Sequence, residues 1–212
     1  VLVRSWAKAR DVSTTFQRHT PSPYAHCLLV VTFLRIKGLA PNLQPRSCAP
    51  EMVDGIDCAF APVTENREQR RARLKRDLEA DAALPGLLAD YFEWLYRLLS
   101  VEFQYQAASP RLGTTLHKQN LWRDAHLRRD HPFTKPPMWR LSIEDPFEHA
   151  ESARPHDLGD VLTKQGQNDF LAEVTTAHDK LKKLKGRDAT RQGYEALFAD
   201  VHAAASSPAP LI

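Results

Sequence analysis

The sequence is organised around two nearby segments, Leu141-Ser142-Ile143-Glu144-Asp145-Pro146-Phe147-Glu148 and, after a short spacer, His156-Asp157-Leu158-Gly159. Proline disfavours the helical region for the residue before it, so we expect Asp145 in an extended backbone with its side chain projecting. Pro146 donates no backbone hydrogen, which argues against a central strand that continues through it. We expect Phe147 to be buried and to pin the turn to a core, which leaves Asp145 and Glu148 at a rim.

The size and composition of the chain favour an ordinary globular protein. It has 212 residues, of which 42% are apolar and 26% are charged, so it can bury a sizeable core. The net charge of +3 is compatible with a polyanionic partner without indicating one. Three widely spaced cysteines without a C-x-x-C pair argue against a disulfide framework or a zinc site, and they favour a reducing, intracellular setting.

Neither end of the chain reads as a targeting or membrane segment. The longest apolar run, Cys27 to Leu34, is well short of the roughly 20 residues that a membrane span needs, so we expect no membrane association. The first residues, Val1-Leu2-Val3, read as structured chain and not as a signal peptide. We therefore expect the polypeptide to start inside a larger protein.

Hydrophobic periodicity predicts a mainly α protein with a few short strands. Apolar spacing indicates helices over residues 2–10, 23–37, 87–99, 170–184 and 194–201, with Gly38 as the stop of the second. The second of these is apolar on nearly every face and should be buried. Alternating apolar residues predict a short strand over 101–107. The tail from 206 to 212 is small, polar and proline-rich, and we expect it to be frayed.

Two positions suggest anion binding. Arg4 and Lys8 lie one turn apart on the first predicted helix, where like charges repel unless an anion offsets the cost. A solvated basic face is the alternative. Ser22 is a good N-cap and Pro23 suits the first helical position, which puts Tyr24 in a first turn where the helix dipole favours anions.

The densest positive run is Arg67 to Arg76. Intervening acids supply pairs at helical spacing, so a solvated helix is the leading interpretation. An RNA-contacting ridge is the alternative. Because no aromatic residues are interleaved, such a ridge would bind phosphates without reading sequence.

Several motifs in order resemble the noncanonical RNA nucleotidyltransferases, the family of terminal uridylyltransferases and their poly(A) polymerase relatives. The matching segments are Arg4-Ser5-Trp6-Ala7-Lys8, Ser22-Pro23-Tyr24, Leu39 to Gln44, Gly55 to Phe60, Leu87 to Tyr96, Ser109 to Gly113 and the two opening segments. The resemblance covers residues 1–185 and implies the helical central domain of that family, including the poly(A)-polymerase-associated region. Residues 186–212 would be a C-terminal helix and a flexible tail.

The resemblance implies a role for each matching residue at the start of the chain. Arg4 and Lys8 take the positions of two lysines that touch the nucleotide triphosphate. Tyr24 takes the position of a tyrosine that stacks on the base. Pro23 stands where relatives place a serine that contacts the terminal phosphate, and a proline cannot make that hydrogen bond. Ser22 is the candidate to replace it.

The opening segments would read the base. Asp145 matches an aspartate that accepts a hydrogen bond from uracil, and Glu148 lies in the same nucleotide-binding segment. His156 matches a histidine that lies beside the base and helps to exclude adenine, with His149 as a competing candidate because the spacer is long. The arginine of Ser109 to Gly113 would be close to RNA or structural, and both interpretations stay open.

The catalytic chemistry of the family needs a Gly-Ser loop and three carboxylates on a palm domain that hold two magnesium ions. No Gly-Ser followed by Asp-x-Asp occurs in this sequence. We therefore expect neither catalytic nor metal-binding residues here, with Mg²⁺ or Mn²⁺ on a palm outside this chain. The expected partners are UTP or ATP, an RNA 3' end and that palm.

The predicted function is the nucleotide-selecting part of an enzyme that adds UMP from UTP to RNA 3' ends. One alternative is a poly(A) polymerase that uses ATP. The other is a non-catalytic helical RNA-binding or scaffold module that kept the fold.

Overall fold

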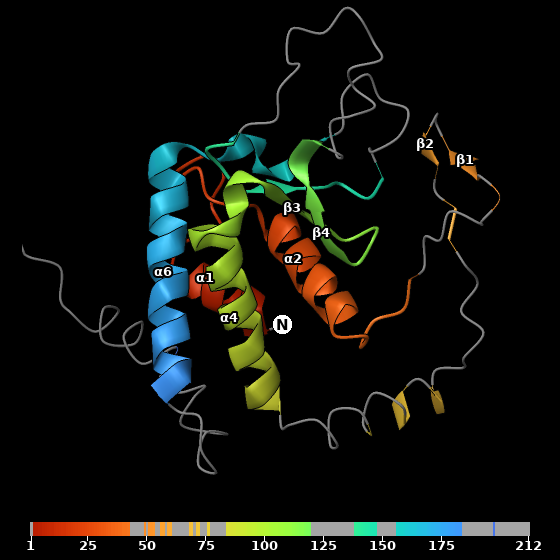
Figure 1. Ribbon diagram of the computed structural model, residues 1–212, viewed down its shortest axis with the longest axis horizontal. Coiled ribbons are helices and arrows are strands. Elements are labelled where there is room, and N and C mark those ends of the chain that lie inside the picture. The colour runs from red at the N-terminus through yellow and green to blue at the C-terminus, as the bar shows by residue number, and fades with distance from the viewer. Residues whose placement is uncertain are drawn as a thin grey trace, which may run out of the picture.

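The computed structural model describes residues 2–42, 49, 51–53, 56–57, 59–60, 68–69, 71–72, 76, 84–119, 138–147, 156–183 and 197. Its helices are α1 (Leu2–Ala9), α2 (Pro23–Ile36), α4 (Leu84–Ser100) and α6 (Lys164–Lys183), with 3-10 turns η1 (Glu102–Gln104) and η3 (Leu158–Val161). Its strands are β1 (Met52–Val53), β2 (Ile56–Asp57), β3 (Gln106–Ser109), β4 (Thr114–His117) and β5 (Ser142–Ile143). The described part is thus mainly helical with a few short strands, as predicted (Figure 1).

Helix α2 begins and ends where its sequence predicts. The Ser22 side chain accepts a hydrogen bond from the backbone N–H of Ala25 at 3.1 Å, and Pro23 occupies the first turn. Gly38 follows the C-cap with a φ of +71°, a conformation that favours glycine. Between these ends Leu29 and Phe33 are buried, whereas Val31 and Ile36 are 40% and 41% exposed. Helix α2 is therefore central but buried on one face only, so the predicted burial of nearly every face is wrong.

The core forms where α1, α2 and α4 meet. Trp6 packs edge-on against Phe92 with ring centroids 4.8 Å apart, and Phe33 packs edge-on against Tyr91 at 5.5 Å. His26 of α2 belongs to this core because its Nε2–H donates to the carbonyl oxygen of Val12 at 2.7 Å. Burial lowers the pKa of His26 to about 4 against that hydrogen bond, so its ring is neutral.

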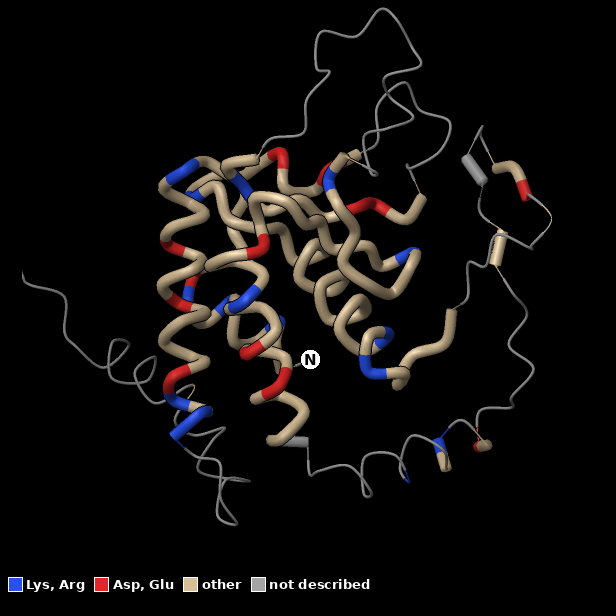
Figure 2. The backbone as a smooth tube through the Cα atoms, viewed as in Figure 1, with Lys and Arg blue, Asp and Glu red and all other residues tan. Residues whose placement is uncertain are grey.

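Helices α4 and α6 pack side by side and run in opposite directions (Figure 1). His178 joins them, because its Nε2 lies 2.8 Å from a carboxylate oxygen of Glu93 while its ring stacks on Tyr96 at 4.7 Å. Figure 2 shows acidic residues along the middle of α6 and basic residues gathered in its last turn, where the basic residues complement the helix dipole.

A three-stranded sheet of order β4-β3-β5 packs on α2. Strand β3 pairs antiparallel with β4 and parallel with β5, so β5 lies at an edge of the sheet. The guanidinium of Arg35 ties α2 to the β3–β4 turn by donating to the carbonyl oxygen of Arg111 at 2.6 Å. Ala107 and Ala108 are both buried, so the middle strand is covered on both faces.

The predicted strand over 101–107 is wrong for its first half. Residues 102–104 form the 3-10 turn η1, whose end is closed by the N–H of Tyr105 donating to the carbonyl oxygen of Glu102 at 2.9 Å. Val101 and Tyr105 are 69% and 53% exposed, so the apolar alternation does not mark a buried face. Strand pairing with β4 begins only at Gln106. A strand forms only where a neighbouring segment satisfies its backbone N–H and C=O groups, and β4 does not pair with residues 102–104.

Two predicted elements fall mostly outside the described residues. In the predicted helix 194–201 only Leu197 is described, where it is helical and buried. Of the basic run 67–76, residues 68, 69, 71, 72 and 76 are described, and these are helical. Within the described residues, no helix is both long and apolar enough to cross a membrane.

The first turn of α6 is fixed against the loop that precedes α2. A Cβ on Gly166 would lie 2.1 Å from the carbonyl oxygen of His19 and 2.6 Å from that of Arg18. Backbone atoms cannot move aside as a flexible side chain can, so only glycine allows this approach. The loop before α2 and the start of α6 therefore form one rigid corner.

We expect Gly166→Ala to destabilise the protein by about 3 kcal/mol, because the added methyl meets backbone oxygens and overpacks the corner. Helix propensity alone would predict a gain of about 1 kcal/mol for the same change. Urea unfolding measures the difference. Asn168→Ala, an exposed position on the same helix, is the control and should leave stability equal or slightly higher. A neutral Gly166→Ala would show that the corner is loose.

Candidate functional site

Strand β5 and the segment that begins at His156 form the centre of the candidate site. Their backbones pair antiparallel at Glu144 and Asp157, and the N–H of Asp145 donates to the carbonyl oxygen of His156 at 3.1 Å. This pairing agrees with the extended backbone predicted for Asp145. The two halves of the sequence signature are therefore neighbours in space.

The predicted burial of Phe147 is wrong. Its side chain is 47% exposed, whereas Ile143 and Pro146 are buried. The turn is pinned from its strand side because Ile143 joins the core under the sheet. Asp145 is only 6% exposed, so it lies below the surface and not at a rim.

Asp145 and His156 are in direct contact. The His156 Nδ1 atom lies 3.2 Å from one carboxylate oxygen of Asp145, and the other oxygen accepts the N–H of Phe147 at 3.0 Å. A carboxylate has about four lone-pair sites, so these contacts leave it able to accept from a ligand. The His156 side chain is 44% exposed and forms the solvent side of the pair. Glu148 and His149, the other candidates of this segment, lie outside the described residues.

The residue before Asp145 is a buried carboxylate held from the sheet. Glu144 is 1% exposed, and one of its oxygens receives both Nε and Nη2 of Arg111, at 2.9 and 2.8 Å. Its other oxygen accepts the hydroxyl of Ser109. The arginine of the Ser109 to Gly113 motif, whose role the sequence left open, is thus paired with the signature segment.

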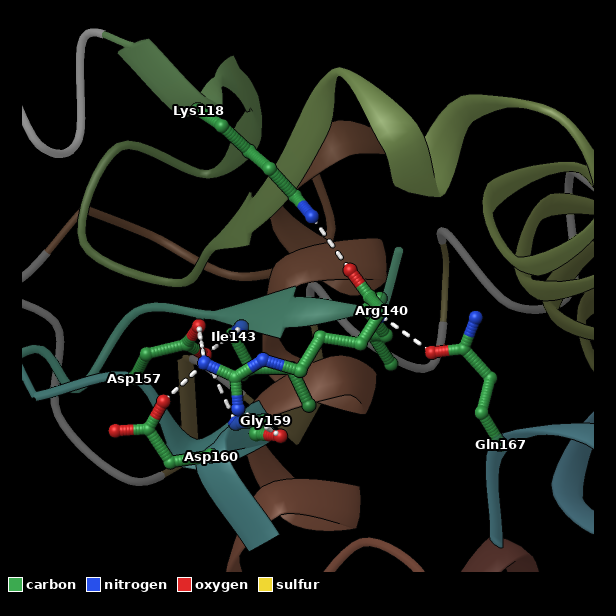
Figure 3. A network of polar contacts seen from close by, with 8 residues as sticks. Lys118, Arg140, Ile143, Asp157, Gly159, Asp160 and Gln167 are labelled. Atoms are coloured by element: carbon green, nitrogen blue, oxygen red, sulfur yellow. Dashed lines mark hydrogen bonds and ion pairs between the residues drawn. The ribbon is translucent and has the colours of Figure 1, made fainter. Parts of the chain in front are cut away.

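A second buried network lies on the other side of β5 (Figure 3). One oxygen of Asp157 accepts the N–H of Ile143 at 2.9 Å and that of Gly159 at 2.8 Å. Arg140 donates to the carbonyl oxygen of Gly159 at 2.7 Å and pairs with Asp157 at 3.4 Å and with Asp160. Both Asp157 and Arg140 are buried, at 0% and 7% exposure.

Two further polar side chains complete this network. The buried ammonium of Lys118 donates to the carbonyl oxygen of Arg140, and burial lowers its pKa to about 8 against the attraction of Asp157. Gln167 of α6 accepts the N–H of Leu141 at 2.6 Å (Figure 3). The start of β5 is therefore fixed both by the residue that follows β4 and by α6.

The remaining predicted residues gather on α1 and the start of α2. Arg4 and Lys8 are both exposed, and neither forms an ion pair within the described part of the chain. Ser22 uses its oxygen as the helix cap, while its O–H hydrogen has no acceptor among the described residues. Tyr24 is 41% exposed in the first turn of α2.

A cavity lies between α1, α2 and α4, and its lining includes Arg4 but not Tyr24. The cavity has a volume of about 640 Å³ and is lined mainly by apolar residues of α1, α2 and α4, together with Arg4, His26 and Cys27. Tyr24 precedes Cys27 by three residues, so the two share a face of α2, and both are exposed. The mainly apolar lining does not suit a triphosphate.

The two groups of residues are joined through the start of α6. Gly166 contacts the backbone of His19, just before α2, and the next residue, Gln167, binds the backbone of Leu141, just before β5. Helix α2 also packs directly against β5. Figure 1 shows the first turns of α2 and α6 and strand β5 at one end of the molecule.

Within the described ranges, no group of three or more His, Cys, Asp or Glu side chains could hold a metal ion. Glu144 and Asp157 are occupied by amides and arginines. The described residues thus offer no ligand set for Mg²⁺ or Mn²⁺, which the resemblance assigns to a palm domain outside this chain.

Comparison with solved structures establishes the fold. The chain superposes on the Cid1 poly(U) polymerase with Mg and 3'-dATP bound with a TM-score of 0.62 at 23% identity, covering 93% of this chain and 53% of that one. A cytoplasmic RNA terminal U-transferase gives a TM-score of 0.60 at 23% identity, covering 93% and 55%. An mtPAP mutant in complex with ATPγS gives 0.58 at 17% identity, covering 93% and 37%.

The chain therefore has the fold of the noncanonical RNA nucleotidyltransferases, as its motifs predicted. It spans about half the length of the first two of these proteins. No family model matches the sequence, and no curated protein matches it either.

We expect Arg111→Met to destabilise the protein by about 3 kcal/mol, because it leaves the buried Glu144 carboxylate without its cation. Urea unfolding followed by circular dichroism provides the measurement. Lys37→Met is the control, since Lys37 and Asp90 pair at 2.7 Å with side chains 41% and 45% exposed, and such pairs contribute about 1 kcal/mol or less. Similar losses in the two variants would contradict a structural role for Arg111.

Proposed function

We propose that this chain selects the nucleotide in an RNA 3'-terminal nucleotidyltransferase and favours UTP, so that UMP is added to RNA 3' ends. The observation that carries the proposal is the contact between Asp145 and His156, whose side chains are 3.2 Å apart although the residues are eleven positions apart in sequence. A carboxylate and an imidazole held together on a fixed backbone form a polar pair suited to reading a base edge.

The base preference follows from hydrogen-bond complementarity. Uracil presents its N3–H as a donor, whereas adenine presents N1 as an unprotonated acceptor. The Asp145 carboxylate only accepts, so it pairs with uracil and faces adenine with acceptor against acceptor. Leaving polar groups of a pocket unpaired costs about 1–3 kcal/mol each, which is enough for discrimination between bases. His156 lies on the solvent-facing side of the Asp145 carboxylate, where its ring would obstruct the larger purine ring of adenine.

The residues of α1 and α2 would hold the rest of the nucleotide. Tyr24 exposes its ring in the first turn of α2 and would stack on the base. Arg4 and Lys8 would bind the triphosphate, since both are exposed cations on one face of α1. Ser22 would donate its O–H to a phosphate in place of the serine that Pro23 replaces.

Catalysis would come from a palm domain outside this chain, whose carboxylates would hold Mg²⁺ or Mn²⁺ and polarise the reacting phosphate. In this proposal the chain binds and orients the nucleotide and the RNA 3' end, in an intracellular enzyme. Glu148 would contribute to the same nucleotide-binding segment.

Titrating the isolated chain with UTP, ATP and a short single-stranded RNA tests the proposal by calorimetry. We expect UTP to bind more tightly than ATP. Tighter binding of ATP would favour the poly(A) polymerase alternative. Binding of RNA with no binding of either nucleotide would favour a scaffold that kept the fold, as the loss of the phosphate-binding serine at Pro23 would permit.

Asp145→Asn should weaken UTP binding about tenfold and narrow the preference over ATP, because the amide can turn its NH₂ group toward adenine N1. The two dissociation constants, measured side by side, report this change. Asp90→Asn, an exposed acid on α4, removes the same charge elsewhere and should alter neither. An unchanged UTP-to-ATP ratio in Asp145→Asn would falsify the assignment of Asp145.

Tyr24→Ala should weaken both UTP and ATP about tenfold, since base–aromatic stacking contributes about 1–3 kcal/mol and every base has a π face. Tyr24→Phe keeps the ring and should bind within about threefold of the parent chain. The contrast between the two variants isolates stacking from any role of the hydroxyl. Equal binding by Tyr24→Ala and the parent chain would exclude Tyr24 from the site.

A further inference from the structure

The Asp157 carboxylate lies at the edge of strand β5 that faces away from β3. The parallel neighbour β3 covers one edge, and on the other edge the N–H of Ile143 donates to Asp157 at 2.9 Å. The same carboxylate oxygen accepts the N–H of Gly159, so one atom joins β5 to the turn η3. A side chain thus takes the place that a further strand would occupy.

The backbone pairing between these segments is short. It consists of the bridge between Glu144 and Asp157 and the hydrogen bond from Asp145 to His156. Two-stranded pairings are marginally stable at best in water, even when they are longer than this one. The two segments therefore depend on side chains to stay in register. Asp157 provides a buried side-chain contact between them, because its carboxylate accepts the N–H of Ile143.

Arg140 stabilises the Asp157 carboxylate that joins β5 to η3. Burial raises the pKa of Asp157, while the Arg140 guanidinium and the two backbone N–H groups oppose that rise and favour the carboxylate. Arg140 also binds the carbonyl oxygen of Gly159, at 2.7 Å, and pairs with Asp160, so it holds η3 from two further points (Figure 3). The resulting network contains no exposed polar atom of Asp157 that a nucleotide could contact.

We propose that Asp157 is a positioning residue, whose buried oxygen joins the strand that carries Asp145 to the segment that carries His156 and so fixes the two side chains relative to each other. Its role in base selection rests on the function proposed above, while its role in holding the two segments does not. Hydrogen-bond acceptance is what the link requires, so an asparagine, whose carbonyl oxygen accepts in the same place, can replace it.

Amide hydrogen exchange of the isolated chain tests the positioning role without any nucleotide. In Asp157→Ala we expect the N–H of Asp145, which donates to His156, to exchange at least about tenfold faster than in the parent chain. The N–H of Glu144, which donates to Ala108 inside the sheet at 2.9 Å, should change by less than about threefold. In Asp157→Asn both amides should exchange as in the parent chain.

A control separates positioning from general loss of stability. His178→Ala removes the contact between α4 and α6, away from β5, and should leave the ratio of the two exchange rates unchanged. If Asp145 and Glu144 accelerate equally in Asp157→Ala, or if Asp145 stays protected, the proposal is wrong. Should Asp157→Ala not fold, loss of Asp145 protection in Asp157→Asn would overturn it, since the amide oxygen would then have failed to replace the carboxylate.

A nucleotide arm extends the test to function. If UTP binds the parent chain, Asp157→Ala should lower the UTP-to-ATP affinity ratio at least about fivefold while His178→Ala leaves that ratio unchanged. An unchanged ratio in Asp157→Ala would overturn the role in base selection. If the parent chain binds no nucleotide, the proposed function fails, whereas the exchange experiment still decides whether Asp157 joins the two segments.

Discussion

Glu144 and Asp157, which lie close to Asp145, are both buried carboxylates, and the surrounding structure compensates for the loss of their hydration. Burying an ionised carboxylate is costly unless hydrogen bonds and a cation replace its water. Glu144 receives Arg111 from the β3–β4 turn and Ser109 from β3, whereas Asp157 receives two backbone amides and Arg140. The contacts of Glu144 join the end of β5 to β3 and the β3–β4 turn, and the contacts of Asp157 join β5 to η3.

The central helix α2 brings a second group of predicted site residues to the same end of the molecule. It packs against α1 on one side and against the sheet on the other, and its first turn exposes Tyr24. The glycine contact at the start of α6 fixes the loop that leads into α2, and the adjacent Gln167 fixes the chain that leads into β5. An exposed ring, exposed cations and a hydrogen-bonding acid are thereby mounted on elements that pack against one another.

The sequence predicted which residues form the candidate site, but it did not predict the buried polar residues that hold them in place. The resemblance to the nucleotidyltransferase motifs predicted that Asp145 and His156 belong to one site, and the structure brings the two side chains into contact. The importance of Asp157 was not predicted, although it stands next to His156, because its partners Ile143 and Arg140 are 14 and 17 residues away. Nothing in the local pattern distinguishes a solvated aspartate from one buried among distant amides.

Local physics accounts for what the sequence determined by itself. Ser22, Pro23 and Gly38 set the ends of α2 through capping, a fixed φ and a left-handed stop, and apolar periodicity set the other helices. The tertiary structure alone decided that Phe147 is exposed while Glu144 is buried, and that η1 replaces the first half of a predicted strand. Burial and strand pairing depend on which distant segments supply a cation, an amide or a neighbouring edge, and no stretch of chain carries that information alone.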